Sequence, residues 1–69
     1  MPRVYVEWVA GRGEAQRKEL ARRITDAVVD IATVRPEQVQ IVFREYPATH
    51  YFRGGMMWTD IVARERAGT

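Results

Sequence analysis

The sequence predicts a small α/β subunit in which two parallel strands are joined by one long helix and followed by a C-terminal hairpin. Alternating apolar residues over 3–9 and 39–45 are typical of strands, and a helical repeat fills residues 14–33 between them. A Gly-Gly pair at 54–55 indicates the hairpin. The chain has only 69 residues and no cysteine, so it has little core and no disulfide to stabilise it. We expect a single domain, residues 1–69, that assembles into an oligomer.

The first predicted strand, residues 3–9, has one clearly apolar face. Val4, Val6 and Trp8 alternate with residues that point the other way. Residues 10–13 contain two glycines and are expected to form the turn that leads into the helix.

The helix predicted over 14–33 carries an apolar stripe and many charges. Glu14 and Lys18, like Glu19 and Arg23, are spaced four residues apart in the order that favours ion pairing. The residues assigned to the apolar stripe are Leu20, Ile24, Ala27, Val28 and Ile31. The basic residues assigned to the solvated face are Arg17, Lys18, Arg22 and Arg23.

A short turn at 36–38 is expected to precede the second strand, residues 39–45. Two strands connected by a helix make a β-α-β unit, whose strands are parallel and whose crossover is right-handed. One helix can cover only one face of such a sheet. Tyr5, Val9 and Val42 on the other face therefore need a partner, which a second subunit can supply.

The segment 46–58 is expected to lie apart from this unit. Its hairpin is followed by the apolar residues 56–58, which have no evident core of their own to join, so we expect them to cover a neighbouring subunit. A short terminal helix through Ala63 and frayed residues 64–69 complete the prediction.

The composition narrows the possible functions. Ten of the 11 basic residues are arginine, which favours planar, bidentate recognition of carboxylate or phosphate. A single histidine, His50, and the lack of cysteine argue against a metal site, and no cofactor is implied. The balanced charges of the helix argue against nucleic-acid binding. No apolar run is long enough to span a membrane and no signal peptide is recognisable, so we expect a cytoplasmic protein.

The chain resembles the 4-oxalocrotonate tautomerase family from residue 2 to about residue 60. The resemblance rests on Pro2, Gly11-Arg12, the single helix, Val39 to Glu45 and Tyr51-Phe52-Arg53-Gly54-Gly55. It implies a tautomerase-like subunit that assembles as a hexamer, a trimer of dimers built from one kind of chain or two. It also implies that Met1 is removed, and that the freed proline amine moves protons in small 2-oxo acids or their dienols.

The site residues implied by the resemblance follow from matching positions. Pro2 matches the catalytic proline, and Arg12 matches the arginine that holds a substrate carboxylate. Tyr51 and Val9 match an aromatic wall and an apolar wall of the pocket. Gln40 falls where the best-known members carry a second arginine, and this departure puts isomerisation of dicarboxylates in doubt.

Arg53 is a second departure, because the family usually has an apolar residue there. Arg53 is a candidate substrate-binding residue, which would supply a second positive charge to the pocket in place of the arginine missing at position 40. Together with Arg12 and Pro2 it makes a chemically consistent set, because nearby cations and an apolar setting lower the pKa of an amine toward the range where it is a useful base. The same cations stabilise a developing enolate.

Other interpretations stay open. A hydratase or dehalogenase would use Pro2 together with a carboxylate such as Glu7, and would consume water. A non-catalytic subunit of an oligomer with this fold would retain Met1, whose peptide bond turns the Pro2 nitrogen into an amide with no usable lone pair. Pro2 can also act simply as a residue that begins a strand.

Overall fold

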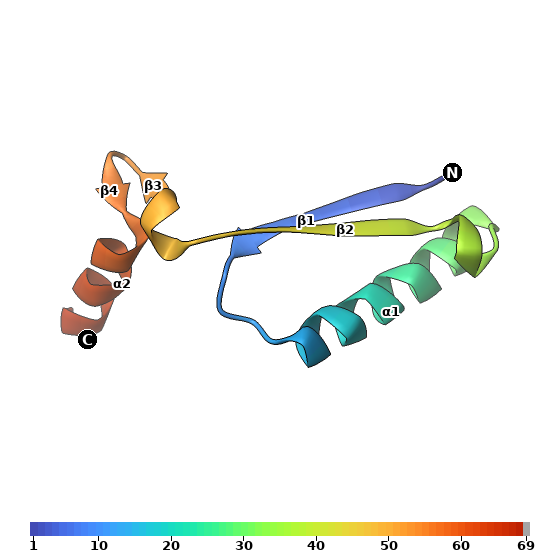
Figure 1. The fold of residues 1–69 in the computed structure, drawn as a ribbon, viewed down its shortest axis with the longest axis horizontal. Helices are drawn as coiled ribbons and strands as arrows, with labels where there is room; N and C mark the ends of the chain where they lie inside the picture. Colours follow the sequence, from blue (N-terminus) through green and yellow to red (C-terminus); the bar gives the residue numbers. More distant parts are fainter. Residues whose placement is uncertain (69) are drawn as a thin grey trace.

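The computed structural model describes residues 1–68 and confirms the predicted β-α-β subunit with parallel strands and a C-terminal hairpin (Figure 1). Its elements are β1 (Arg3–Val9), α1 (Glu14–Ala32), η1 (Pro36–Gln38), β2 (Gln40–Tyr46), η2 (Ala48–His50), β3 (Phe52–Arg53), β4 (Met56–Met57) and α2 (Trp58–Ala67), where η denotes a short 3₁₀ helix. Within residues 1–68, no helix is long and apolar enough to cross a membrane.

The two long strands lie side by side, and α1 runs along one face of the pair (Figure 1). Val4, Val6 and Trp8 are half-buried and alternate with exposed residues, as the period of two predicts. The Trp8 ring packs on Phe43 of β2 with 5.3 Å between the ring centroids. The helix-covered face of the sheet is therefore the one that the sequence pattern assigned.

Strand β2 begins and ends one residue later than predicted. The Val39 amide donates a hydrogen bond of 3.0 Å to the Pro36 carbonyl, so this residue completes the preceding turn and is not part of the strand. At the other end, the Tyr46 carbonyl accepts a 2.8 Å hydrogen bond from the Ala10 amide, which extends the pairing of the strands. The shift matters because it places Tyr46 opposite Val9.

The side of α1 that faces the sheet differs in part from the predicted stripe. Ala27 is exposed and Ile31 is 82% exposed, although both were assigned to the apolar stripe. The half-buried helix residues are Arg17, Leu20, Ala21, Ile24, Thr25, Val28 and Val29. The prediction of a solvated Arg17 was thus wrong, because the helix turns this residue toward the strand ends.

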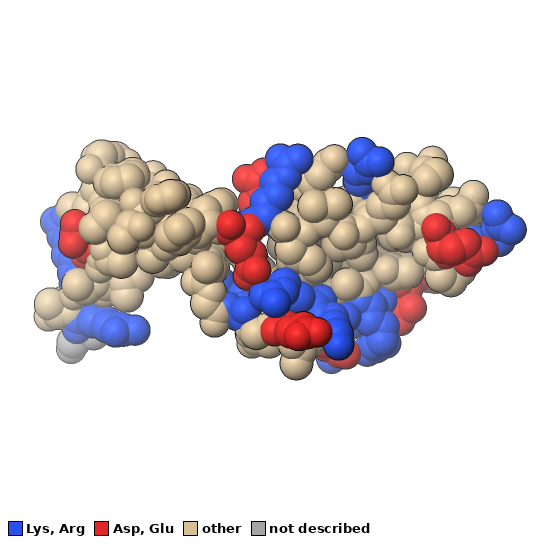
Figure 2. All heavy atoms as spheres, in the orientation of Figure 1, with Lys and Arg blue, Asp and Glu red and all other residues tan. Residues whose placement is uncertain are grey.

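The remaining face of α1 is charged, and acidic and basic side chains alternate along it (Figure 2). The predicted pairs are present, with 3.1 Å between Lys18 and Glu14 and 2.7 Å between Arg23 and Glu19. Hydrogen bonds from Arg22 and Arg23 lower the pKa of Glu19 to about 2. These pairs partly neutralise the basic side chains of the helix.

The C-terminal residues form a separate small module beyond the ends of β1 and β2 (Figure 1). The hairpin between β3 and β4 turns at Gly54 and Gly55, whose φ angles of 59° and 81° suit glycine and a tight two-residue turn. Helix α2 continues to Ala67, so the predicted end at Ala63 and the predicted fraying from residue 64 were wrong. Thr69 lies outside the described residues.

The isolated chain is too extended to bury its apolar side chains. Its radius of gyration is 16.0 Å, whereas a compact domain of this length has a value of about 11 Å. None of the described residues is fully buried. On the face of the sheet away from α1, Tyr5 is 46% and Val42 is 41% exposed. These surfaces are the ones for which the sequence predicted a partner.

Candidate active site

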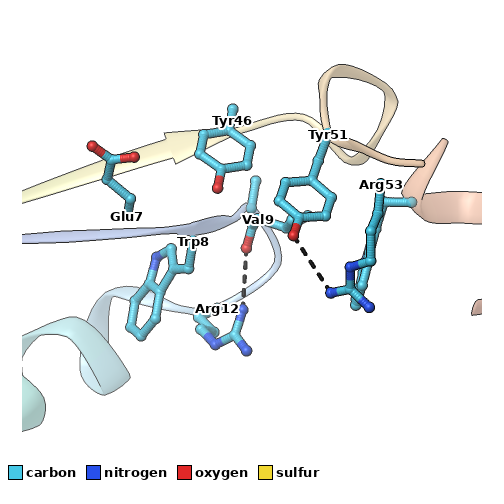
Figure 3. A pocket seen from close by; sticks show the side chains of 9 residues that line it. Glu7, Trp8, Val9, Arg12, Tyr46, Tyr51 and Arg53 are labelled. Atoms are coloured by element: carbon cyan, nitrogen blue, oxygen red, sulfur yellow. Dashed lines mark hydrogen bonds between the residues drawn. The ribbon is translucent and has the colours of Figure 1, made fainter. Parts of the chain in front are cut away.

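A cleft of about 420 Å³ opens where the C-terminal module meets the ends of β1 and β2 (Figure 3). It is lined by Glu7, Trp8, Val9, Ala10, Arg12, Tyr46, Tyr51, Arg53 and Trp58. Four of the predicted site residues are in this set: Val9, Arg12, Tyr51 and Arg53. They come from a strand end, a loop and the module, so residues far apart in the sequence meet here.

Arg12 reaches the cleft from the loop between β1 and α1. Gly11, just before it, has a φ of 141°, a conformation that favours glycine and turns the loop at this point. The guanidinium carbon lies 4.6 Å from the centroid of the Trp8 ring, and Nη1 donates a 3.1 Å hydrogen bond to the Val9 carbonyl. Stacking on the indole and one backbone hydrogen bond thus orient a cation whose other donors can bind a ligand.

Arg53 reaches the same cleft from β3. Its Nη2 donates a 3.4 Å hydrogen bond to the Tyr51 hydroxyl, and this contact raises the pKa of Arg53 above its usual range. Its guanidinium also lies 5.7 Å from the centroid of the Trp58 ring. Figure 3 shows the guanidinium groups of Arg12 and Arg53 projecting toward the same region beside Tyr51. The cleft therefore has positive charge on two sides.

Aromatic rings form the wall between the module and the sheet. Tyr46 and Tyr51 stack with 6.1 Å between their centroids and only 2° between their planes. Tyr51 in turn meets Trp58 edge-on at 5.5 Å. These contacts fix the flat faces that a planar, unsaturated ligand can contact.

Pro2 and Gln40 lie together at the opposite end of the sheet. The backbone N–H of Gln40 donates a 2.9 Å hydrogen bond to the Pro2 carbonyl, and Arg3 Nε donates a 2.7 Å hydrogen bond to the side-chain oxygen Oε1 of Gln40. The seven steps along β1 from Pro2 to Val9 span about 23 Å. One chain thus brings together four of the six predicted site residues and holds the other two too far away to share a ligand with them.

Several residues that line the cleft were not predicted as site residues. Trp8 was assigned to packing under the helix, but its position near the end of β1 exposes it to the cleft as well. Tyr46 was placed in the segment after the strand. If the last residue of β2 had been predicted correctly, the pairing of Tyr46 with Val9 would have identified Tyr46 as a residue near the cleft.

Glu7 also lines the cleft, from the exposed face of the sheet. Its Oε1 pairs with Arg44 Nη1 at 3.5 Å, and Arg44 lies 4.3 Å above the Tyr5 ring. Chemically, the cleft of one chain can bind a small anion with a flat apolar part through two guanidinium groups and the aromatic wall.

Comparison with known proteins identifies the family of the chain. The family model described as "Tautomerase enzyme" matches residues 2–61. A probable tautomerase of Halalkalibacterium halodurans is 33% identical over 60 residues, covering 87% of this chain and 98% of that protein. One of Staphylococcus saprophyticus is 37% identical with the same coverage.

Solved structures give the same result. A heterohexamer 4-oxalocrotonate tautomerase of Chloroflexus aurantiacus matches with a TM-score of 0.80 and 28% identity, covering 88% of this chain and 98% of that one. A 4-oxalocrotonate tautomerase isozyme of Methylibium petroleiphilum matches with a TM-score of 0.78 and 29% identity, covering 99% and 100%. The chain therefore belongs to the 4-oxalocrotonate tautomerase family of tautomerase enzymes.

Proposed function

We propose that this chain is an isomerase that moves a proton in a small 2-oxo acid or its dienol, with the amine of Pro2 as general acid and base after removal of Met1. The observation that carries the proposal is the cleft, in which Arg12 and Arg53 place two cations beside an aromatic wall. Membership of a tautomerase family supports the reaction class.

In this proposal Arg12 binds the substrate carboxylate, because its planar fork matches two carboxylate oxygens. Arg53 adds positive charge beside the C2 oxygen, where loss of the enol proton leaves an enolate. Tyr51 and Val9 form the walls against the flat carbon chain. A conjugated acid satisfies all these contacts at once, since its atoms lie in one plane from the carboxylate to the double bonds.

The Pro2 amine would move the proton. It removes a proton from the enol hydroxyl, the 2-oxo group forms as electrons shift along the chain, and the ammonium returns the proton to a carbon. Met1 is 81% exposed, so its removal costs little packing within one chain. Burial in an apolar site and nearby arginines would lower the pKa of the amine and keep a basic fraction at neutral pH.

A complete site then requires a second copy or a partner chain of the same fold. Pro2 and the cleft end of β1 in one chain are about 23 Å apart, which is too far for one small substrate to contact both. We propose a hexamer, a trimer of dimers, in which the cleft of one subunit meets the Pro2 end of another. The Chloroflexus aurantiacus relative is a heterohexamer, so the proposed hexamer is built from one kind of chain or from two.

The proposal is tested by proton exchange. The protein, shown by intact mass to lack Met1, is mixed with 2-oxo acids in D₂O, and loss of the C3 proton signal is followed by NMR. We expect enzyme-dependent exchange for substrates with a free carboxylate and little exchange for their methyl esters. Absence of exchange across aliphatic and aryl 2-oxo acids, in protein with a free proline amine, would overturn the proposal.

The hydratase hypothesis remains the second candidate because Glu7 lines the cleft. Its carboxylate is already engaged by Arg44, which makes it a less available base for water. Addition of water to an unsaturated acid would give a product that is heavier than its substrate by the mass of one water molecule, whereas isomerisation would leave the mass unchanged. A chain that retains Met1 in its native host would instead support the non-catalytic subunit.

Gln40→Arg is expected to improve use of dicarboxylates. A charged donor at the Pro2 end would bind the second carboxylate with a charge-assisted hydrogen bond, a contribution of about 1.5–3 kcal/mol. The nearby Arg3 would reduce this gain through repulsion, so we expect a KM roughly tenfold lower for a dicarboxylate substrate. Steady-state kinetics with the matching monocarboxylate, whose KM should change little, provide the control. Gln40→Met should give no gain.

A further inference from the structure

The loop that carries Arg12 is held by a closed ring of contacts in which two cleft residues, Arg12 and Trp8, are joined to two residues outside the cleft lining, Arg17 and Glu45. The Trp8 indole donates a 2.8 Å hydrogen bond from Nε1 to Oε2 of Glu45. The other carboxylate oxygen of Glu45 accepts a 3.0 Å hydrogen bond from Arg17 Nη1. The same Arg17 nitrogen donates a 3.0 Å hydrogen bond to the backbone carbonyl of Arg12. Because Arg12 stacks on Trp8, both its backbone and its guanidinium are tied to one carboxylate.

The pair at the centre of this ring differs from the other ion pairs of residues 1–68. The side chains of Arg17 and Glu45 are 33% and 24% exposed, whereas the ion pairs along the outer face of α1 and those of Arg35 and Arg44 join side chains that are at least 47% exposed. Partial burial weakens solvent screening and holds the geometry better than at the surface. The Arg17–Glu45 pair also joins two elements that are distant in the sequence, the first turn of α1 and the end of β2.

The pairing has an electrostatic consequence for Arg12. Within residues 1–68, no carboxylate forms an ion pair with Arg12, although Glu45 is bound to the indole on which Arg12 stacks. Arg17 neutralises that carboxylate. Without Arg17, the negative charge of Glu45 would be free to attract the Arg12 guanidinium away from the cleft and to compete with an anionic ligand.

We infer that Glu45 and Arg17 are positioning residues, which hold Arg12 in its ligand-binding orientation through the Trp8 ring and the loop carbonyl, and that Arg17 also keeps Glu45 from neutralising it. The ligand assigned to Arg12, a substrate carboxylate, rests on the proposed function. The ordering of the Arg12 side chain by Glu45 and Arg17 is independent of the proposed function, because it follows from the contacts within the chain.

The first test is a double-mutant cycle. Glu45→Gln should raise KM for a carboxylate substrate about tenfold while kcat changes less than about twofold, since a misplaced binding group weakens ground state and transition state alike. In an Arg12→Ala background, Glu45→Gln should have almost no further effect, because the group that it positions is gone. Additive losses in the double variant would overturn the inference.

Variants of Arg17 make a sharper prediction. Arg17→Met should raise KM more than Glu45→Gln does, because it leaves a carboxylate free beside Arg12. Combining Arg17→Met with Glu45→Gln should recover part of that loss, and Arg17→Lys should preserve most of the wild-type KM. A double variant that is worse than Arg17→Met alone would show that the pair serves only stability.

A readout that needs no activity separates this inference from the proposed function. The ¹⁵N relaxation of the Arg12 Nε–H group, assigned with Arg12→Lys, should report an ordered side chain in the wild type and a mobile one in Glu45→Gln. Glu14→Gln, which removes an exposed ion pair of the same helix, is the matched control and should leave Arg12 ordered. Equal order in wild type and Glu45→Gln would refute the inference even if no substrate is ever found.

Discussion

Blocking the amine of Pro2 is expected to lower kcat/KM for enol isomerisation by about 10²–10⁴-fold, the usual contribution of a positioned acid–base group. A chain with one extra glycine ahead of Pro2 has the same side chains as the mature protein, but its proline nitrogen is an amide. An amide nitrogen has no usable lone pair and cannot carry the proton. The loss should therefore be in kcat, with the carboxylate site formed by Arg12 left intact.

The measurement compares the two chains, each verified by intact mass, in the same ultraviolet assay of enol disappearance. Binding of an unreactive carboxylate analogue, followed by calorimetry, is the control and should be unchanged within about twofold. Pro2→Ala, which keeps a primary amine at nearly the same place, should lose less activity than the extended chain. If the extended chain keeps full activity, the proton carrier is another group, and the aromatic hydroxyls of the cleft become the next candidates.

The secondary structure could be predicted because it depends on near neighbours in the sequence. Alternation of Val4, Val6 and Trp8 indicated β1, and the Gly-Gly pair indicated the hairpin turn. The fold class followed from the order of these elements, because a single helix between two strands makes them parallel. The family resemblance then supplied the expected roles of individual positions.

Features that depend on tertiary contacts could not be predicted in this way. Ile31 continues the helical spacing of its apolar neighbours, but the two-stranded sheet leaves it 82% exposed. Arg17 is a charged residue on a charged helix, and only its meeting with Glu45, 28 positions away, makes it half-buried. The exact end of β2 depended on one backbone hydrogen bond to Tyr46.

The candidate site, like the fold, could be predicted only in part from the sequence. The sequence identified Arg12 and Arg53 as possible partners, and the structure places both around one cleft. Pro2 lies at the start of β1 and the cleft lies at its end, so the length of the strand separates the two parts of the proposed site. A site divided in this way ties the proposed activity to assembly, and assembly can be tested at the exposed face of the sheet.

Val42→Asp is expected to abolish assembly, and with it the folded state and the activity. Val42 lies opposite Tyr5 on the face of the sheet that α1 does not cover, where both are partly exposed in one chain. If a second subunit covers this face, the new carboxylate is buried without a partner, at a cost of several kcal/mol. Because none of the residues 1–68 is fully buried within one chain, little stability is left once association fails.

Light scattering after size exclusion, together with circular dichroism, would measure this outcome. Val42→Ile, which keeps the branched apolar shape, is the control and should assemble and remain active. For the wild type, the same reasoning predicts a melting temperature that falls on dilution, since folding and association are coupled. A Val42→Asp chain that stays fully assembled would show that this face is not an interface. A folded, active monomer would contradict the proposed site shared between subunits. Pro2 and the cleft of one chain lie about 23 Å apart along β1, too far to act on the same small substrate.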